Sequence, residues 1–577
     1  MTTKKQSLFF HKLKNKQLSK IFYEMALLLK MQDIPFKPEA YANASREINN
    51  LPESIQEIAK RKELENIPYI GKNIAEKIIE FLKTKKIKKH KQLKRKIPIN
   101  ICELILVQGI GVKTIKTLYK KLKIKNLKDL ESAANLGKIS VLPGFSQKIE
   151  NNILQSIKFV KKNKNKFLLG EVLPIAEQIK KQLKNLPEVK RIQTAGSVCR
   201  MQETIGDINL LAVSGKPDLL MQYFCSMPGI KKIIAKGKTK SLIRLESGLN
   251  VDLCIVKSKS WGSGLQYFTG SKEHNINLRK IAEEKGLLLN EYGLFKNKKC
   301  IAGKTEKEIY NALDMDCPAP ELRTASGEIQ ASQNHTLPKI IKQNSIKADL
   351  HMHTDWSDGL ASIQEMAQTA QSMGYEYIAI TDHVGKLDIA NALDKNKLMR
   401  QIKEIDKVNA GFTGFRILKG CEENIRKDGS LDLPDSVLAK LDIVIASVHN
   451  NMKMNKIAMT KRIIKAMENP HVNIIGHATG RILKTRQGYD LDWPLIFKAS
   501  KKTNTALEIN AFYDRLDIGD KLIRMAVNAG VKLIISTDSH SPEHLKYMKL
   551  GIAQARRGWA ENKNILNTMS CEEFLNF

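Results

Sequence analysis

The sequence predicts a multidomain protein with an all-α N-terminal region, a mixed middle region and a C-terminal α/β barrel. The chain has 577 residues, more than one hydrophobic core holds, so three or more domains are expected. Turns centred on Gly recur between helical segments in the first third. Short apolar strands alternate with helices in the last third, a pattern that predicts a barrel of parallel strands.

The charge of the chain is strongly positive and unevenly distributed. Lys and Arg total 96 against 60 acidic residues, a net charge of +36. The excess is +23 over residues 1–170, +9 over 171–345 and +4 over 346–577. An AT-rich genome that favours Lys could explain part of the total but not this gradient. The gradient predicts that a polyanion binds mainly to the N-terminal third.

Cysteine usage and the N-terminus indicate the compartment. Eight cysteines occur without a CxxC pair, so neither a disulfide framework nor a thiolate zinc site is indicated. MTTKKQSLFFHKLKNKQ lacks the apolar region of a signal peptide, and no apolar run approaches the roughly 18 residues that span a bilayer. We expect a cytoplasmic monomer without a membrane partner, associated with the nucleoid when it binds DNA.

Three segments of the N-terminal third share one design: an apolar helix end, a tight turn and a helix opened by polar or basic residues. They are IPYIGKNIAEKI (67–78), VQGIGVKTIKTL (107–118) and LPGFSQKIENNI (142–153). Gly permits φ > 0 at the turn, and the next helix presents free N–H groups that can hold a phosphate. The residues expected at phosphates are Gly71, Gly109, Gly111, Lys113 and Gly144.

The repetition decides how these turns are interpreted. Tyr69 and Ser146 each replace one Gly, so only the second copy has both. A single copy would be read as an ordinary turn between helices. Three copies in a segment of charge +23 indicate binding to the DNA backbone, which is read without regard to sequence. This is the helix-hairpin-helix pattern, assigned to residues 1–90 and 91–170.

The last third places potential metal ligands at the ends of its predicted strands. The seven strand candidates are IKADLH, YEYIAIT, FRILKGCE, DIVIASVH, VNIIGH, TALEINA and VKLIIST. In an α/β barrel the C-terminal ends of the strands build the active site, so side chains there converge. The candidate ligands are His351, His353, Asp358, His383, Glu422, His449, His477, Asp538 and His540.

Nine such residues exceed the need of one ion, so two or three ions are expected. One His at a strand end is usually an ordinary polar residue. Nine ligand-type residues at the C-terminal ends of the strands of one barrel instead indicate a metal site. Imidazole and carboxylate together suit Mn²⁺ or Zn²⁺ better than Mg²⁺. Such ions would generate hydroxide at neutral pH and clamp a phosphate. Arg481 in TGR and Arg515 in YDRL are candidate phosphate clamps.

Residues 190–323 combine several motifs in a fixed order. RIQTAGS (191–197) is an apolar strand ending in Gly-Ser, and LNVDLCIV (249–256) carries an acid. LQYFTGSKEHNINLR (265–279), GLLLNEYGLF (286–295) and PAPELR (318–323) follow. In this order the segment resembles the family X DNA polymerases. The resemblance implies an α+β nucleotidyltransferase palm over 171–258 and a thumb over 259–323.

The same resemblance implies a nucleotide site for dNTPs. Asn275 would meet the minor-groove edge of the incoming base, where A·T and G·C pairs offer similar acceptors. The implied nucleotide-binding residues are Gly196, Ser197 and Arg200 at the phosphates, Tyr267, Phe268 and Gly270 at the sugar, and Asn275 at the base.

One of the three carboxylate positions implied by the resemblance is altered. These positions fall on Asp207, Asn209 and Asp252, and residues 207 and 209 point to one face of a strand. Two Mg²⁺ or Mn²⁺ ions about 3.5–4 Å apart need anionic oxygens, and the middle position bridges them. Asn209 offers an oxygen without charge, and Cys199 stands where family members usually carry Arg. We expect impaired DNA synthesis; the alternative is that Asn209 ligates adequately through its oxygen.

The remaining regions resemble the same family. IPFKPEAYANAS (34–45) and the first hairpin resemble its small N-terminal domain, in which the Lys of IAEK can form a Schiff base with an abasic sugar. That position is Lys77, and a phosphate contact is an equally good interpretation. DLHMHTDWSDG (349–359) with TDH, GCE, SVH, IGH and TDSH resembles the polymerase-and-histidinol-phosphatase (PHP) phosphoesterase domain throughout. A polar linker over 324–345 would precede this distorted seven-stranded barrel over 346–577.

The order of these domains implies a DNA-repair protein acting on gapped, nicked or primer-template DNA. Family members of this order use the PHP domain as a Mn²⁺-dependent 3′-5′ exonuclease. The leading hypothesis is an active nuclease with weak or absent polymerase. A fully bifunctional polymerase and exonuclease is the first alternative, and a non-catalytic DNA-binding protein is the second. A small-molecule phosphatase would have no need of three hairpins.

Overall fold

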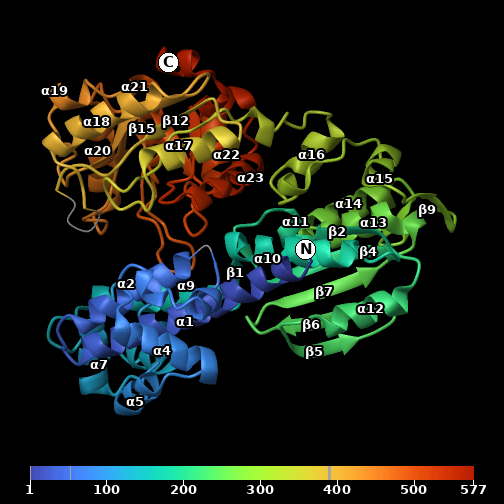
Figure 1. Cartoon of the computed structure of the whole chain (residues 1–577). Helices are drawn as coiled ribbons and strands as arrows, with labels where there is room; N and C mark the ends of the chain where they lie inside the picture. The colour runs from blue at the N-terminus through green and yellow to red at the C-terminus, as the bar shows by residue number, and fades with distance from the viewer. Residues whose placement is uncertain (1, 52, 387–390) are drawn as a thin grey trace. The chain divides into compact units, whose positions relative to one another are not determined.

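The computed structural model describes residues 2–51, 53–386 and 391–577 (Figure 1). The chain divides into two compact units, Met1–Asn165 with Lys484–Arg486, and Lys166–Leu483 with Gln487–Phe577. Within the described residues, every helix lacks either the length or the apolar composition that crossing a bilayer requires.

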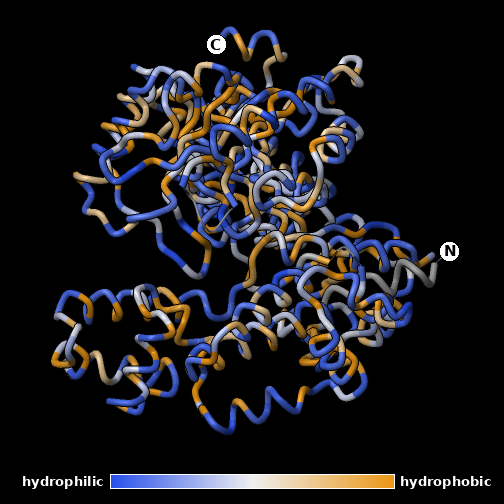
Figure 2. The backbone as a smooth tube through the Cα atoms, turned by 60° about the vertical axis from the view of Figure 1, so that its left-hand side comes forward, coloured by the Kyte–Doolittle hydropathy of each residue, from blue (hydrophilic) through white to orange (hydrophobic). Residues whose placement is uncertain are grey.

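The N-terminal unit is all-α, as predicted. Hydrophobic and hydrophilic residues are interspersed along the chain (Figure 2), and in this unit the apolar faces of the helices form one core around Phe22, Ile78 and Leu130. They are α1 (Thr2–Met31), α2 (Lys37–Asn50), α3 (Ile55–Lys60), α4 (Lys72–Thr84), α5 (Lys88–Lys96), α6 (Ile101–Leu104), α7 (Val112–Leu122), α8 (Leu127–Asn135) and α9 (Gln147–Asn163).

The three predicted hairpin turns have one backbone conformation. At the first turn position Tyr69, Gly109 and Gly144 have φ of 62°, 88° and 83°. At the second, Gly71, Gly111 and Ser146 are extended residues that begin α4, α7 and α9. Only the first position therefore needs the left-handed region that favours Gly, and Tyr69 occupies it at a steric cost.

The middle region contains a five-stranded sheet in the order β2-β4-β7-β6-β5. All neighbours are antiparallel except β4 and β7, which run parallel and pair Asn209 with Asp252. Helix α10 (Leu169–Lys184) packs on β2, and α12 (Pro217–Ser226) lies against β5 and β6 (Figure 1). The strands are β2 (Val189–Ala195), β4 (Asp207–Ser214), β5 (Ile230–Lys236), β6 (Lys240–Leu245) and β7 (Asn250–Ile255).

The predicted thumb combines helices with a small antiparallel sheet. Its elements are α13 (Trp261–Thr269), α14 (Lys272–Glu284), β8 (Leu288–Asn290), β9 (Gly293–Lys296), β10 (Lys299–Ala302) and α15 (Glu306–Ala312). The fully buried His274 of α14 lies 2.7 Å from the Tyr310 hydroxyl and 2.8 Å from a Glu328 carboxylate oxygen. This polar cluster locks α14 against the segment that follows the thumb.

Part of the predicted polar linker over residues 324–345 is folded. The segment contains helix α16 (Glu328–Gln333), whose Glu328 and Ser332 are fully buried, and Ile341 joins the barrel core. The polar composition that suggested a solvated linker instead supplies buried partners, since Glu328 pairs with His274.

The last third is a nearly closed barrel of seven parallel strands in sequence order, as predicted. A bridge between Met352 and Ser539 joins the first strand region to the last, and the His353 amide donates to the Ser539 carbonyl at 2.7 Å. The strands are β11 (Ala348–Asp349), β12 (Tyr377–Ile380), β13 (Arg416–Asn424), β14 (Ile443–Ser447), β15 (Ile474–Ile475), β16 (Ala506–Asn510) and β17 (Leu533–Ser536).

Helices cover the outside of these strands. One apolar cluster fills the barrel interior around Leu350, Leu418 and Ile534, and a larger one lies between strands and helices. The helices include α17 (Ile363–Ser372), α18 (Lys395–Asn409), α20 (Lys456–Met467), α21 (Trp493–Thr503), α22 (Asp520–Ala529) and α23 (Met548–Arg557). With its interior filled by side chains, the barrel can form a site only at the ends of its strands.

Candidate metal centre and nucleotidyl-transfer site

The barrel brings together all nine predicted ligands. Eight of them fall in three groups whose ligand atoms lie within 4.8 Å of one another: His353, Asp358, His383 and His540; His351, His353 and Asp538; His383, Glu422 and His449. The ninth, His477, has its Nε2 3.0 Å from a Glu422 carboxylate oxygen. Glu422 lies within β13 and not after it, because this strand continues to Asn424.

Glu422 is the centre of this cluster. It is 1% exposed, and besides His477 it faces four further imidazoles, of which His353 has its Nε2 3.7 Å from a carboxylate oxygen. Its carboxylate oxygens lie 2.9 Å from His383 Nδ1, 3.2 Å from His449 Nε2 and 3.5 Å from His351 Nε2. One carboxylate surrounded by imidazoles from four other strands can bridge two cations.

The electrostatics of the cluster favour charged carboxylates. Although burial opposes ionisation, the surrounding imidazoles hold the pKa of Glu422 well below its usual range. Burial likewise opposes the ionisation of Asp358, yet His540, His353 and His383 lower its pKa to about 2. Both acids therefore offer anionic oxygens at neutral pH.

Two imidazoles of the cluster, His353 and His449, have a pKa below the usual range, with burial as the main cause. Burial, together with the charges of His540 and His383, lowers the pKa of His353 to about 3, so this ring is neutral. Among the described residues, five buried ring nitrogens find no hydrogen-bond partner: His351 Nε2, His353 Nδ1 and Nε2, His449 Nδ1 and His477 Nδ1. Buried polar atoms normally have partners, so this donor set fits a cluster of divalent cations.

Sequence reasoning missed Glu508, which orients one of these ligands. Its Oε1 accepts from His351 Nδ1 at 2.7 Å, which leaves Nε2 directed at the cluster. Glu508 is fully buried in β16, whose neighbour Asn510 donates to Asp538 at 3.1 Å. The signal in the sequence is an acidic residue inside the apolar stretch TALEINA. It was missed because it lies within the predicted strand and not at its end.

The two predicted phosphate clamps differ in their surroundings. Arg515 Nε lies 3.6 Å from Asp538 Oδ2, so its guanidinium borders the cluster. Arg481 Nη2 donates to Glu203 at 2.6 Å and to the Leu516 carbonyl, and its Nε donates to the Arg515 carbonyl at 3.1 Å. Protein acceptors from distant parts of the sequence therefore occupy Nε and Nη2 of Arg481, and its role as a phosphate clamp stays a prediction.

The three predicted palm positions lie together but do not form an acidic triad. Asn209 Nδ2 donates to Asp207 Oδ1 at 3.1 Å, and Lys240 Nζ lies 3.0 Å from Asp252 Oδ2. The Lys240 ammonium thus offsets the charge of Asp252, and the uncharged Asn209 amide stands where two cations would need a third anionic ligand. These described residues do not fit a pair of closely spaced Mg²⁺ ions. Sequence reasoning missed Lys240, one of many lysines.

The predicted nucleotide-binding residues lie around the same sheet edge. Gly196 has φ of 63°, and a Cβ there would lie 2.8 Å from Asn209 Nδ2, so Gly permits this close approach. Arg200 Nη1 donates to the Thr269 carbonyl next to Gly270. In the thumb, Asn275 Nδ2 donates to the Tyr267 carbonyl at 2.7 Å.

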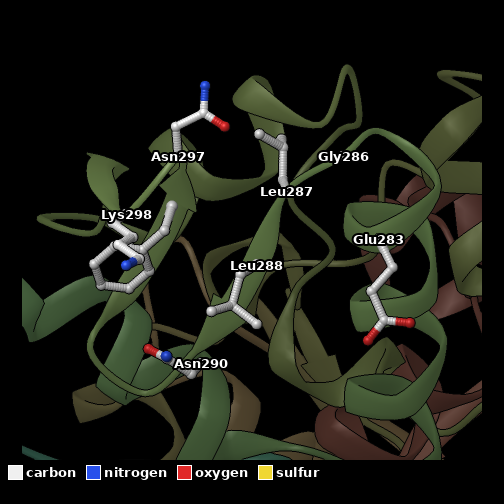
Figure 3. Close-up of a pocket in the computed structure, with 8 residues that line it drawn as sticks. Glu283, Gly286, Leu287, Leu288, Asn290, Asn297 and Lys298 are labelled. Carbon is white, nitrogen blue, oxygen red and sulfur yellow. The ribbon is translucent and has the colours of Figure 1, made fainter.

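Ser197 and Phe268 are the last two predicted nucleotide-binding residues. Ser197 lies in the short helix α11 (Gly196–Cys199), and the rings of Tyr267 and Phe268 meet edge to face at 5.3 Å. The structure therefore brings the predicted phosphate, sugar and base positions into one region. A separate cavity of about 500 Å³ lies in the thumb between α14 and the β8–β9 hairpin, lined by residues such as Glu283, Leu288 and Asn297 (Figure 3). It contains none of the predicted site residues.

Lys77 lies on α4, behind the first hairpin turn. Its Nζ donates to the Asn73 carbonyl at 2.8 Å. Partial burial and the neighbouring charges of Lys89 and Lys37 lower its pKa, against the opposing effect of Glu76 and Glu80. A lowered pKa increases the fraction of free amine. The free amine is the form that attacks a sugar, whereas the ammonium is the form that binds phosphate.

These parts define a class of protein: helical DNA-binding turns, a nucleotidyltransferase-type sheet with a thumb, and a barrel with an imidazole-carboxylate centre. Four family descriptions match the chain, namely a helix-hairpin-helix domain over 13–87, a SAM-like helix-hairpin-helix tandem over 102–158, a DNA polymerase beta thumb over 264–324 and a PHP domain over 349–511.

Curated relatives agree with these matches. The DNA polymerase/3′-5′ exonuclease PolX of Bacillus subtilis is 36% identical over 563 residues, covering 97% of this chain and 98% of the relative. A probable phosphatase of Thermoanaerobacter sp. is 34% identical over 207 residues, covering 33% of this chain and 78% of that protein. A probable phosphatase of Caldicellulosiruptor saccharolyticus is 30% identical over 205 residues, covering 34% of this chain and 80% of that protein. The chain belongs to the family X DNA polymerases that carry helix-hairpin-helix, thumb and PHP domains.

Proposed function

We propose that this protein is a DNA-repair nuclease of the family X type that trims 3′ ends at gaps and nicks, with a palm impaired in synthesis. The observation that carries the proposal is the contrast between the two candidate metal sites. The barrel holds nine ligand-type residues around Glu422, whereas the palm pairs its two carboxylates with Asn209 and Lys240.

The nuclease assignment is supported by the chemistry of the barrel. When bound there, divalent ions supply Lewis acidity and lower the pKa of water to near neutrality. Glu422 and Asp538 provide the negative charge, and buried imidazoles provide neutral donors, a set that suits Mn²⁺ or Zn²⁺ in two or three positions. Arg515, at 3.6 Å from Asp538, is placed to meet a phosphate oxygen. The PolX relative of Bacillus subtilis is named a 3′-5′ exonuclease.

The proposed defect in synthesis concerns charge. Asn209 presents an N–H donor to Asp207, so a cation at this position would have to reorient the amide before its oxygen could ligate. The Asp252 carboxylate keeps one buried oxygen, Oδ1, without a hydrogen-bond partner among the described residues, while Oδ2 is paired with Lys240. A single cation bound through Asp252 remains compatible with binding of a dNTP but supplies half of a two-ion site.

The DNA substrate follows from the N-terminal unit. Family membership and the helix-hairpin-helix domains imply DNA binding. The helix N-termini at Gly71 and Gly111, which no side chain caps, present N–H groups in an environment of excess Lys, which suits the DNA backbone. At α9 the Ser146 hydroxyl already accepts from the Ile149 amide. The proposed partner is gapped, nicked or primer-template DNA, bound through its phosphates. Lys77, with its lowered pKa, is a candidate nucleophile for abasic sugars.

A second candidate function is full bifunctionality, with gap filling by the palm as well as trimming. It is favoured by the approach of Arg200 to Gly270, both predicted nucleotide-binding residues, and by the name of the Bacillus subtilis relative. It requires the Asn209 amide to release Asp207 and turn its oxygen to a cation.

One assay separates these functions. A labelled duplex with a one-nucleotide gap is incubated with Mn²⁺, with and without dNTPs, using the unmodified protein and the Asn209→Asp and His351→Ala variants. We expect shortening by the unmodified protein that disappears in His351→Ala, and extension only in Asn209→Asp. Extension by the unmodified protein at the rate of Asn209→Asp would establish bifunctionality, and no shortening with Mn²⁺ would leave a DNA-binding protein.

A further inference from the structure

The palm contributes one carboxylate to a contact with the barrel. Glu203 lies between α11 and β3 (Thr204–Ile205), three residues after the nucleotide-site residue Arg200. Its Oε1 accepts hydrogen bonds from Arg481 Nη2 and from Gln554 Nε2, each at 2.6 Å. Both donors belong to the barrel, so Glu203 connects the palm to the barrel. Arg481 and Gln554 follow it by 278 and 351 residues in the sequence.

The partner of Glu203 holds the loop that carries Arg515. Arg481 donates to the carbonyls of Arg515 and Leu516, so its guanidinium spans the palm carboxylate and the backbone of this loop. The side chain of Arg515 then extends to Asp538, with Nε 3.6 Å from Oδ2. Three successive contacts therefore connect the Glu203 carboxylate to a proposed metal ligand.

The surrounding packing fixes this arrangement. Leu516 and Leu550 of the barrel belong to the same apolar cluster as Leu169 and Ile205 of the palm region. A Cβ at Gly170 would lie 2.5 Å from the Cβ of Tyr513, so only Gly allows the two backbones to approach here. The Glu203–Arg481 pair thus lies at the edge of a close-packed contact and not between mobile surface side chains.

Glu203 is also the anion that compensates the charge of this contact. Arg481 and Arg557 both face it, Arg481 Nη2 at 2.6 Å and Arg557 Nη2 at 3.7 Å. Arg557 has a second carboxylate partner in Asp520 at 3.1 Å, whereas Arg481 has Glu203 and backbone carbonyls. Loss of the Glu203 charge would therefore affect Arg481 more than Arg557, because a partly buried guanidinium would lose its anion.

We propose that Glu203 is a positioning residue of the nuclease: through Arg481 it holds the loop that directs Arg515 at the metal centre. The inference rests on the proposed nuclease function. It assigns the palm a role in phosphodiester cleavage that is independent of nucleotidyl transfer, because none of the contacts involves Asp207, Asn209 or Asp252. Even with an impaired synthesis site, the palm would then be required for full exonuclease activity of the barrel.

The test compares Mn²⁺-dependent exonuclease kinetics of full-length variants. Glu203→Ala should lower kcat by about tenfold or more, since small displacements of a phosphate-binding group are costly. KM for DNA should change little, because the hairpins that bind DNA are untouched. Glu203→Gln keeps an acceptor and should lose less, and Glu177→Gln, which removes an exposed palm carboxylate on α10, is the matched control and should match the unmodified protein.

A double-variant cycle separates positioning from general stability. If Glu203 acts through Arg515, the Glu203→Ala/Arg515→Ala protein should be no slower than Arg515→Ala alone. Losses that multiply, or a Glu203→Ala variant as active as the control, would overturn the inference. The amount of Mn²⁺ bound should stay unchanged in Glu203→Gln, and a loss of bound metal would also contradict a positioning role. Absence of exonuclease activity in the unmodified protein would instead refute the proposed function.

Discussion

The barrel and the palm of this protein are both candidate metal sites, and they differ in how their charges are balanced. In the barrel, Glu422 and Asp538 face imidazoles, and five of the buried ring nitrogens have no hydrogen-bond partner among the described residues, a donor set that fits cations. In the palm, Asp207 accepts from Asn209 and one oxygen of Asp252 pairs with Lys240, so protein groups already face both carboxylates. The number of acidic residues alone does not show whether a site can bind metal ions. The charge of the groups that face the carboxylates must be considered as well.

The largest effect is expected at the centre of the barrel. Glu422→Gln removes the charge that five imidazoles share, and we expect exonuclease activity to fall by about a thousandfold or more, the scale of losing metal-ion catalysis. Cleavage of a labelled gapped duplex with Mn²⁺ measures this. Affinity for the same DNA, measured by fluorescence anisotropy, should not change. Retention of most activity would mean that Glu422 is not a metal ligand.

Orientation of the ligands should matter less than their charge. Glu508→Ala frees His351 Nδ1, and we expect the affinity for Mn²⁺ to fall by about 10- to 100-fold, the usual cost of losing an orienting partner. Metal titration by calorimetry measures it. Glu508→Gln keeps an acceptor for the ring and should lose less. Equal losses in the two variants would show that the charge of Glu508, and not its hydrogen bond, is what the site needs.

The hairpin turns allow a comparison between two glycines of one motif. Gly109 has φ of 88° and Gly111 has ordinary extended backbone, yet a Cβ at either would meet nothing within 4 Å. Gly109→Ala should therefore destabilise the N-terminal unit by about 1 kcal/mol, the cost of a side chain in the left-handed region. Gly111→Ala should leave the unfolding midpoint nearly unchanged. Equal thermal stabilities would contradict this account of the turn.

Comparing prediction with structure shows what kind of information each site contains. The three turns and the seven strands follow from local pattern, and so does the proximity of the nine candidate ligands, because strand ends in a barrel converge. Glu508, Lys240 and the Glu203–Arg481 pair were not foreseen, since each depends on a partner from a distant strand or domain. The buried role of Glu328 in the presumed linker was missed for the same reason.

The smallest effect concerns Lys77 and its pH dependence. Burial and neighbouring cations lower the pKa of Lys77, so its amine is deprotonated at lower pH than that of an exposed lysine. If it attacks abasic sugars, borohydride trapping on abasic DNA should rise with pH and reach its plateau earlier than for an exposed lysine. Lys77→Arg should abolish trapping, with Lys83→Arg as the control on the same helix. Trapping that persists in Lys77→Arg would assign the adduct to another residue.

In the proposed function, the carboxylate missing at Asn209 is the main limit on synthesis by the palm. The most direct measurement is primer extension on a one-nucleotide gap with Mg²⁺ in a His351→Ala background, which prevents trimming, comparing Asn209 with Asn209→Asp. The account predicts that Asn209→Asp raises the extension rate by about a hundredfold or more, the scale of restoring a bridging ligand to a two-metal site. Equal rates for the two proteins would contradict it.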